Sequence, residues 1–147
     1  IVRPAHTYRR ISPFTFVTGD DWAWRILNDR PIIIHGDGTS LWTYTHSRDL
    51  AVPFVALLGN AKALGEAFHI TRHMDAYTWD QIAAQMARSL GKEADIVHVP
   101  TDTLIRYNEA WGGPLLGDFA WSSVYDNSKV MSVAGEFECK VSLAEGL

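Results

Sequence analysis

The stretch from Ile32 to Ala51 reads IIIHGDGTSLWTYTHSRDLA, and it predicts two strands that lead into a helix. The three isoleucines favour a short strand, Gly36-Asp37-Gly38 is a turn sequence, and Leu41 to His46 alternates like a second strand. Ser47 is a capping residue type, so we expect a helix to begin near Arg48. A turn and a helix start at one edge commonly border a ligand cleft, although an ordinary hairpin and helix start fit the same residues.

Length and composition are those of one globular domain. A chain of 147 residues can bury one core, so we expect a single domain over residues 1–147. The formal net charge of −4, with scattered Lys and Arg, argues against nucleic acid or an anionic membrane as partner. No apolar run approaches the length that spans a bilayer. Cys139 is the only cysteine, which excludes an internal disulfide and fits a reducing cytoplasm.

Strand and helix signals alternate along the rest of the chain, which indicates an α/β arrangement. The clearest is a helix from Thr78, which forms a capping box with Gln81 and is followed by apolar residues at spacings of three and four. The segment Leu50 to Leu58 is apolar on all sides, as in a helix packed on both flanks. We expect an irregular loop over 111–123. The other expected strands are 1–5, 66–71 and 95–99, and the other expected helices are 20–28, 101–107 and 127–134.

The order of motifs resembles a known family. Gly36-Asp37-Gly38-Thr39, an aromatic-rich strand ending in His46, and Asp49-Leu50-Ala51 at the start of an apolar helix resemble the sugar-binding half of the extended short-chain dehydrogenases/reductases. These are the NAD(P)-dependent epimerases and dehydratases of nucleotide sugars. Further segments agree in the family's order: Val2-Arg3-Pro4 with Tyr8, Ala67 to Thr71, Asp126 to Lys129, and Ser142 to Leu147.

The resemblance implies that this is the C-terminal substrate-binding lobe of a Rossmann-type enzyme, a small mixed sheet with packed helices whose dinucleotide-binding part is absent. The chain contains no Gly-rich dinucleotide motif, and in the family both that motif and the catalytic Tyr-x-x-x-Lys would lie upstream of Ile1. The Tyr-x-x-x-Lys spacing of Tyr125 and Lys129 falls in the segment that matches the later Asp126 to Lys129 motif of the family. We therefore expect no catalytic residue here, and NAD or NADP bound by the complete protein but not tightly by this fragment. Both ends look cut, because Ser142 to Glu145 supplies a capping box for a helix that does not follow.

The resemblance also implies site residues. Pro4 and His6 would lie beside the nicotinamide and Arg3 would contact substrate, although a salt bridge explains Arg3 equally well. His46 is expected to bind substrate in the cleft, or to hydrogen-bond a backbone carbonyl in the core.

Two departures from the family concern the diphosphate. Trp42 stands where most nucleotide-sugar enzymes have an Arg that binds the diphosphate. Trp121 and Ser122 stand near the position of a second such Arg. Either Arg9, Arg10, Arg25 or Arg48 replaces them, or the substrate is not a nucleoside diphosphate sugar. Both indoles could stack on a sugar ring, or could serve ordinary packing.

Other chemistry has little support in the sequence. His69 and His73 are four residues apart, but they lie on a strand that runs into a turn, so we expect no metal site. Cys139 has no evident base beside it, and no Gly-x-Ser-x-Gly elbow is present.

The first functional hypothesis is the substrate-recognition part of an NAD(P)-dependent sugar epimerase, dehydratase or reductase, with a sugar or nucleotide sugar as partner. The complete protein could form a homodimer through helices outside this chain. The alternative is a non-catalytic binding or scaffold protein of the same family, for which RNA is disfavoured by the acidic balance. A third is a self-standing domain with an unrelated small-molecule role.

Overall fold

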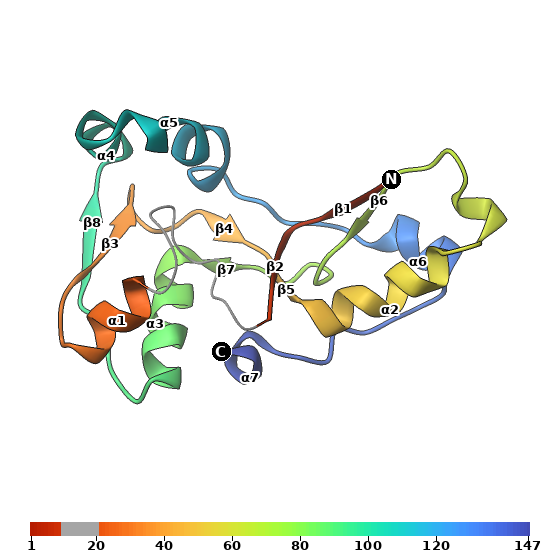
Figure 1. The fold of residues 1–147 in the computed structure, drawn as a ribbon, viewed down its shortest axis with the longest axis horizontal. Helices are drawn as coiled ribbons and strands as arrows, with labels where there is room; N and C mark the ends of the chain where they lie inside the picture. The colour runs from red at the N-terminus through yellow and green to blue at the C-terminus, as the bar shows by residue number, and fades with distance from the viewer. Residues whose placement is uncertain (10–20) are drawn as a thin grey trace. The chain divides into compact units, whose positions relative to one another are not determined.

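The computed structural model describes residues 1–9 and 21–147, and the chain divides into two compact units (Figure 1). Unit 1 comprises Ile1–Arg10, Thr43–Ala76 and Val124–Gly146, and unit 2 comprises Ile11–Trp42, Tyr77–Ser123 and Leu147. Composition alone does not predict this division. The proposed start of the first helix at Asp20 lies outside the described residues.

Unit 1 contains two parallel strand pairs and the helices that accompany them. β1 pairs with β6, with Val2 opposite Phe68, and β2 pairs with β5, with Tyr8 opposite His46. Its core contains Leu57, which packs with Phe68, Ile70 and Val130. Its elements are β1 (Val2–Pro4), β2 (His6–Tyr8), β5 (Tyr44–His46), α2 (Ser47–Leu57), η1 (Ala61–Ala63), β6 (Phe68–Ile70), α6 (Ser128–Ala134) and α7 (Leu143–Gly146).

Unit 2 contains one parallel and one antiparallel strand pair. β3 pairs with β8 in parallel, and β4 pairs with β7 in antiparallel fashion. In its core the Trp22 and Trp79 rings meet edge to face at 6.4 Å, and the Trp42 ring lies 5.2 Å from Trp79. Its elements are α1 (Asp21–Leu27), β3 (Ile32–His35), β4 (Leu41–Trp42), β7 (Tyr77–Thr78), α3 (Trp79–Ser89), β8 (Ile96–Val99), α4 (Thr101–Tyr107), η2 (Glu109–Trp111), α5 (Gly112–Pro114) and η3 (Leu115–Phe119).

The stretch that predicts two strands and a helix forms them, but not as a hairpin. β3 pairs with the distant β8, and it buries Ile32 and Ile34 fully while Ile33 between them is half-exposed. A parallel partner cannot follow through a tight turn, so β3 must find it far along the chain. The expected second strand is interrupted at Thr43, so that β4 belongs to unit 2 and β5 to unit 1.

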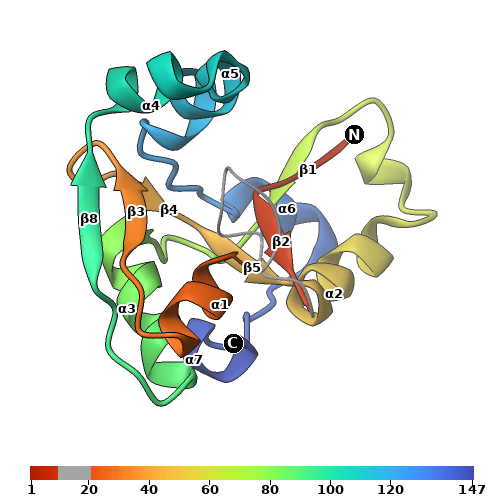
Figure 2. The ribbon, with the colours of Figure 1, turned by 60° about the vertical axis from the view of Figure 1, so that its left-hand side comes forward.

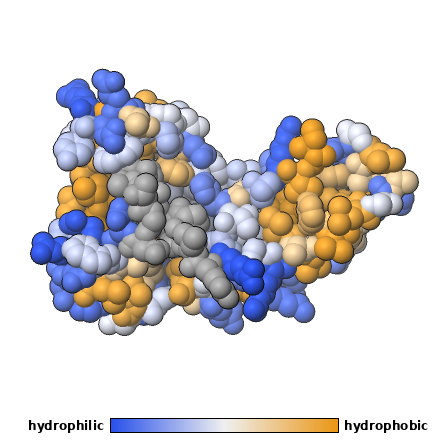
Figure 3. Space-filling model, viewed as in Figure 1, coloured by the Kyte–Doolittle hydropathy of each residue, from blue (hydrophilic) through white to orange (hydrophobic). Residues whose placement is uncertain are grey.

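Helix α2 differs from its sequence prediction at its start and on its surface. The cap is His46, whose Nδ1 accepts from the N–H of Arg48 at 3.3 Å, and not Ser47. The buried residues Asp49, Pro53 and Leu57 recur every fourth position, whereas Val52, Val55 and Leu58 are exposed. Packing on both flanks is therefore wrong for the described residues. Figure 3 shows hydrophobic surface over the part of the molecule that carries α2.

The remaining elements mostly follow the sequence. The Thr78–Gln81 capping box of α3 is confirmed, with both reciprocal hydrogen bonds present. The segment expected to be an irregular loop instead forms the short helical turns η2, α5 and η3, the last a π-helix. The Ser142–Glu145 capping box also forms, and α7 follows it within the chain, so the expectation that no helix follows is wrong.

Candidate functional site

A pocket of about 300 Å³ opens in unit 2 where two parallel strands end. β3 ends at His35, and β8 ends at Val99, two residues before Thr101. In Figure 2 the two strands point the same way, with α4 beyond their ends. Ligands of α/β proteins commonly bind outside the carboxyl ends of parallel strands. The lining residues are His35, Gly36, Asp37, Thr39, Ser40, Thr101, Ala120 and Ser122.

The carbonyl oxygen of Phe119 holds the inner wall of this pocket. It accepts hydrogen bonds from His35 Nε2 at 2.9 Å and Ser40 Oγ at 3.0 Å. The indole N–H groups of Trp42 and Trp79 each donate to the same oxygen at 3.2 Å. Two lining side chains, His35 and Ser40, are thus anchored to one backbone atom.

A second link joins the Phe119 segment to the strands of unit 2. The N–H of Leu41 on β4 donates to Ser122 Oγ at 3.0 Å, and the N–H of Ser123 donates to the carbonyl oxygen of Leu41 at 2.7 Å. These bonds fix the segment that carries Ala120 and Ser122 against the strand. The wall of the pocket is therefore held at two places.

The turn that borders the pocket depends on Gly38. Its φ is +73°, and a Cβ there would overlap the Asp80 carboxylate. Asp80 is in turn paired with His98, at 2.8 Å between Oδ1 and Nε2. Glycine is required here for its backbone conformation and for the space that the Asp80–His98 pair occupies.

The pocket carries one ionised carboxylate and a neutral imidazole. Hydrogen bonds from the Thr39 hydroxyl and N–H hold the pKa of Asp37 below its ordinary value. Burial lowers the pKa of His35, which is 3% exposed, because the protonated ring loses its hydration. Since Nε2 faces a carbonyl oxygen, that nitrogen bears the proton of the neutral ring.

Unit 1 brings together two of the predicted site histidines. His6 on β2 lies 5.7 Å from the Tyr44 ring, and Tyr8 lies 5.3 Å from the His46 ring. Tyr8 and Tyr44 meet at 6.3 Å. The parallel register places these four rings on adjacent strands. His46 is buried and caps α2 through Nδ1, so one of its nitrogens has a structural partner.

The predicted residues on β1 are exposed. Arg3 lies opposite His69 in the strand pair and Pro4 opposite Ile70. Arg3 forms no ion pair with a carboxylate among the described residues. Its contact with substrate, and those of Pro4 and His6 with cofactor, stay predictions.

The two predicted tryptophans have opposite environments in unit 2. Trp42 is 2% exposed and packs against Trp79 and Phe119, with ring centroids at 5.2 and 5.1 Å. Trp121 is 67% exposed, and its N–H donates to Leu116 O at 2.6 Å. Of the two, Trp121 presents ring surface to solvent, and substrate binding by either indole stays a prediction.

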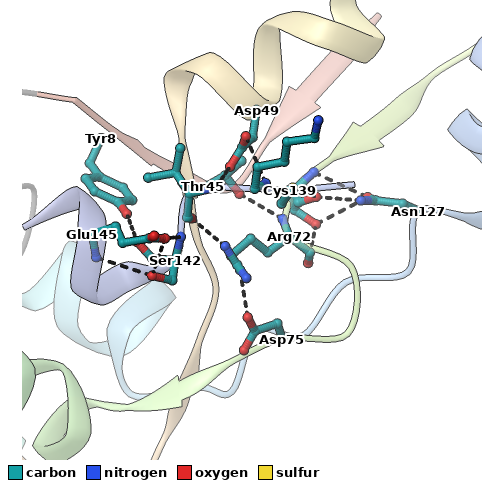
Figure 4. A network of polar contacts seen from close by, with 12 residues as sticks. Tyr8, Thr45, Asp49, Arg72, Asp75, Asn127, Cys139, Ser142 and Glu145 are labelled. Atoms are coloured by element: carbon teal, nitrogen blue, oxygen red, sulfur yellow. Dashed lines mark hydrogen bonds and ion pairs between the residues drawn. The ribbon is translucent and has the colours of Figure 1, made fainter. Parts of the chain in front are cut away.

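A polar network in unit 1 is not predictable from the sequence (Figure 4). Asp49, buried on α2, accepts from the backbone N–H groups of Lys140 and Val141 at 3.1 and 3.0 Å. Arg72 donates to Asp75 at 2.6 Å and also to the carbonyl oxygen of Val141. In the sequence, Asp49 appears only as an acidic residue within a helix, and Arg72 only as a basic residue after a strand. Neither pattern predicts the hydrogen-bond partners of these residues.

A buried asparagine completes this network. Asn127 exchanges hydrogen bonds with the backbone of Thr71, accepting from its N–H and donating to its carbonyl oxygen. The motif Asp126-Asn127-Ser128-Lys129 carried part of the family resemblance, and in the structure its Asn joins two segments of unit 1. The role of this residue in the described structure is therefore architectural.

The described residues give little support to metal binding or to thiol chemistry. Within residues 1–9 and 21–147, no three His, Cys, Asp or Glu side chains gather as they would around a metal ion. Burial raises the pKa of Cys139 to about 11, so its thiol stays protonated at neutral pH. In the same part of the chain, no helix has the length and apolar character to cross a membrane.

Comparison with known proteins identifies the fold. No model of a known protein family matches the sequence. A UDP-glucuronic acid 4-epimerase from Bacillus cereus, bound to UDP-glucuronic acid and NAD, has a TM-score of 0.72 at 23% identity and covers 99% of this chain and 41% of its own. A dTDP-glucose 4,6-dehydratase from Bacillus anthracis in complex with NAD has a TM-score of 0.70 at 18% identity, covering 99% of this chain and 40% of its own.

One curated protein is similar in sequence. The chloroplast stem-loop binding protein of 41 kDa b from Arabidopsis thaliana is 32% identical over 99 residues, which is 66% of this chain and 25% of that protein. The chain thus spans a quarter of that relative and about two fifths of the solved structures. Its mixed α/β fold is that of the C-terminal portion of extended short-chain dehydrogenase/reductase epimerases and dehydratases, as the motif order predicts.

Proposed function

We propose that this chain is the substrate-recognition part of an NAD(P)-dependent epimerase, dehydratase or reductase that acts on a sugar-like substrate. The observation that carries the proposal is the match of 99% of the chain to a UDP-glucuronic acid 4-epimerase bound to substrate and NAD. The polar pocket at the ends of β3 and β8 supports it, because a sugar needs several hydrogen-bonding partners in a small concave site.

In this proposal, the nicotinamide would supply hydride transfer at a sugar carbon. Pro4 and His6 would lie on the cofactor side, and Arg3, Trp42, His46 and Trp121 on the substrate side. The task of this chain would be to hold the sugar ring in one orientation, which lowers the entropic part of the barrier. The motifs for tight dinucleotide binding are absent from these residues.

The exposed apolar face of α2 supports a larger assembly. Val52 and Val55 on the helix and Leu58 at its C-cap are each more than half exposed. An apolar patch of this kind is ordinarily covered. We propose that the dinucleotide-binding part of a longer protein covers it. We also propose that the longer protein forms a homodimer. The single Cys139 favours a cytoplasmic location, which is a further part of the proposal.

Titration of the protein as encoded in its gene with NADH, followed by nicotinamide fluorescence, tests this function. We expect a saturable fluorescence change and transfer of hydride to or from NAD(P) when the sugar substrate is present. A protein that binds neither NADH nor NADPH would contradict the proposal.

A second function is favoured by one observation, the 32% identity to a chloroplast stem-loop binding protein. Against it stand the net charge of −4 and the scattered basic residues. Fluorescence anisotropy with a labelled stem-loop oligonucleotide separates the two functions. Affinity that falls steeply with salt would favour nucleic acid, whereas the enzyme proposal predicts no binding at physiological salt.

A further inference from the structure

The pocket of unit 2 has an unusual balance of charge for a site that would hold a phosphate. Its described lining contains one carboxylate, one neutral imidazole and four hydroxyl-bearing side chains, but no Lys or Arg. Residues 10–20, which the structure does not describe, contain one basic residue in the sequence, Arg10. The basic residues of unit 2 are elsewhere than in the lining: Arg25, Arg30, Arg88, Lys92 and Arg106.

Several of these basic side chains already have partners. Arg25 donates to the carbonyl of Pro31, Arg88 to Gln85 at 2.8 Å, and Lys92 is paired with Asp29 at 2.7 Å. Phosphate recognition in proteins relies on charge-assisted and often bidentate contacts from such side chains. No Lys or Arg side chain is among the described lining residues of the pocket. Asp37 adds a negative charge that repels a phosphate.

The hydroxyl groups, in contrast, suit a neutral polyol. Ser40 Oγ donates to Phe119 O and keeps its acceptor capacity, while Ser122 Oγ accepts from Leu41 N–H and keeps its donor. Asp37 accepts both Thr39 contacts through Oδ1, which leaves Oδ2 for a ligand. A sugar hydroxyl both donates and accepts, so it can match each of these groups.

We propose that this pocket binds an uncharged, hydroxyl-bearing ring and disfavours the phosphorylated form of the same ring. The inference rests on the proposed function, because it names the substrate class that this function would use. The cavity volume of about 300 Å³ lies at the lower end of small-molecule sites, which span roughly 300–1,000 Å³. A monosaccharide unit is therefore the size of ligand that it can enclose.

The test compares paired probes on the full protein. Saturation-transfer NMR and calorimetry would measure binding of glucose, galactose and rhamnose and of their 1-phosphates. We expect at least one free sugar to bind, and its 1-phosphate to bind about tenfold more weakly. Tighter binding of the phosphates, or binding of no sugar, would overturn the inference.

Substitutions locate the effect in the pocket. Ser122→Arg places a cation at its exposed rim, and we expect it to raise the affinity for the sugar 1-phosphate about tenfold. Ser122→Gln is the matched control, since it adds a long polar side chain without charge, and it should leave that affinity unchanged. Equal effects of the two variants would contradict a role for charge at this site.

NADH fluorescence in the same samples keeps this inference separate from the proposed function. NADH binding together with a preference for sugar phosphates would contradict only the inference about the pocket. A preference for free sugars without any NADH binding would contradict only the proposed enzymatic function.

Discussion

At the scale of residues, the pocket of unit 2 is organised by a backbone atom, the carbonyl oxygen of Phe119. Donors from β3, β4 and α3 and from Ser40 converge on it. The Gly36-Asp37-Gly38 turn is recognisable in the sequence as a cleft border, because glycine permits positive φ. Phe119 is not recognisable, since any residue type supplies a carbonyl. Thr101 is missed, and Ser122 is noted only beside Trp121 as a departure from the family, because the pocket lining combines distant segments.

We expect His35 to make the stability of the protein depend on pH. Its pKa in the folded state lies below the ordinary value of 6.5, because burial disfavours the charged ring. Below about pH 6.5 the unfolded state therefore binds more protons than the folded state, and stability decreases as pH falls. We expect the urea midpoint to drop between pH 7.5 and pH 5.5. His35→Gln, which keeps a donor but does not titrate, should show a smaller drop, and equal slopes would refute this role of His35.

Gly38 and Gly59 offer a matched test of steric space. Both have a φ of +73°, but only Gly38 has neighbours within 4 Å of the position that a Cβ would occupy. Gly59→Ala is expected to cost about 1 kcal/mol through backbone strain alone. Gly38→Ala should cost at least about 1 kcal/mol more, because the methyl group meets Asp80 and His98. Chemical denaturation measures the difference, and equal losses would show that the Asp80–His98 pair moves aside freely.

Trp121 is the better of the two tryptophans for testing ring stacking. Because 67% of it is exposed, Trp121→Ala should leave the melting temperature nearly unchanged. If the indole stacks on a sugar, its loss should weaken sugar binding by roughly 0.5–1.5 kcal/mol, with no effect on NADH binding. Calorimetry measures both affinities, and an unchanged sugar affinity would assign Trp121 to no binding role.

At the scale of elements, local signals predict helices well and strand partners poorly. The start of α3 is predictable because Thr78 and Gln81 satisfy each other's backbone within four residues. The pairing of β3 with β8 joins segments far apart in the chain, and no local pattern encodes it. No local pattern encodes the interruption at Thr43 either. There Trp42 is buried in unit 2 and Tyr44 in unit 1.

Asn127 joins two elements of unit 1, the end of β6 and the start of α6. Its side chain is fully buried and bonds both the N–H and the carbonyl of Thr71. Asn127→Ala leaves those groups without this partner, so we expect a loss of about 1–3 kcal/mol. The control Asn28→Ala removes one exposed hydrogen bond to Trp24 O and should cost less than about 0.5 kcal/mol. Similar urea midpoints for the two variants would contradict a linking role for Asn127.

At the scale of the whole molecule, the sequence predicted the fold through the order of its motifs and not through any one of them. The match of 99% of the chain to sugar epimerases and dehydratases agrees with that order. The division into two units, and the pocket within one of them, could not be predicted because both arise from contacts among separate segments. We propose a division in which the sugar ring lies in the pocket of unit 2 and the nicotinamide lies beside Pro4 and His6.

Hydrogen–deuterium exchange of the full protein with and without NADH tests this division most directly. We predict that NADH slows exchange in the dinucleotide-binding part and, within this chain, at residues 3–8, while residues 36–40 and 119–123 are unchanged. Protection that is strongest at the pocket of unit 2, or absent throughout the protein, would contradict the proposed placement of cofactor and sugar.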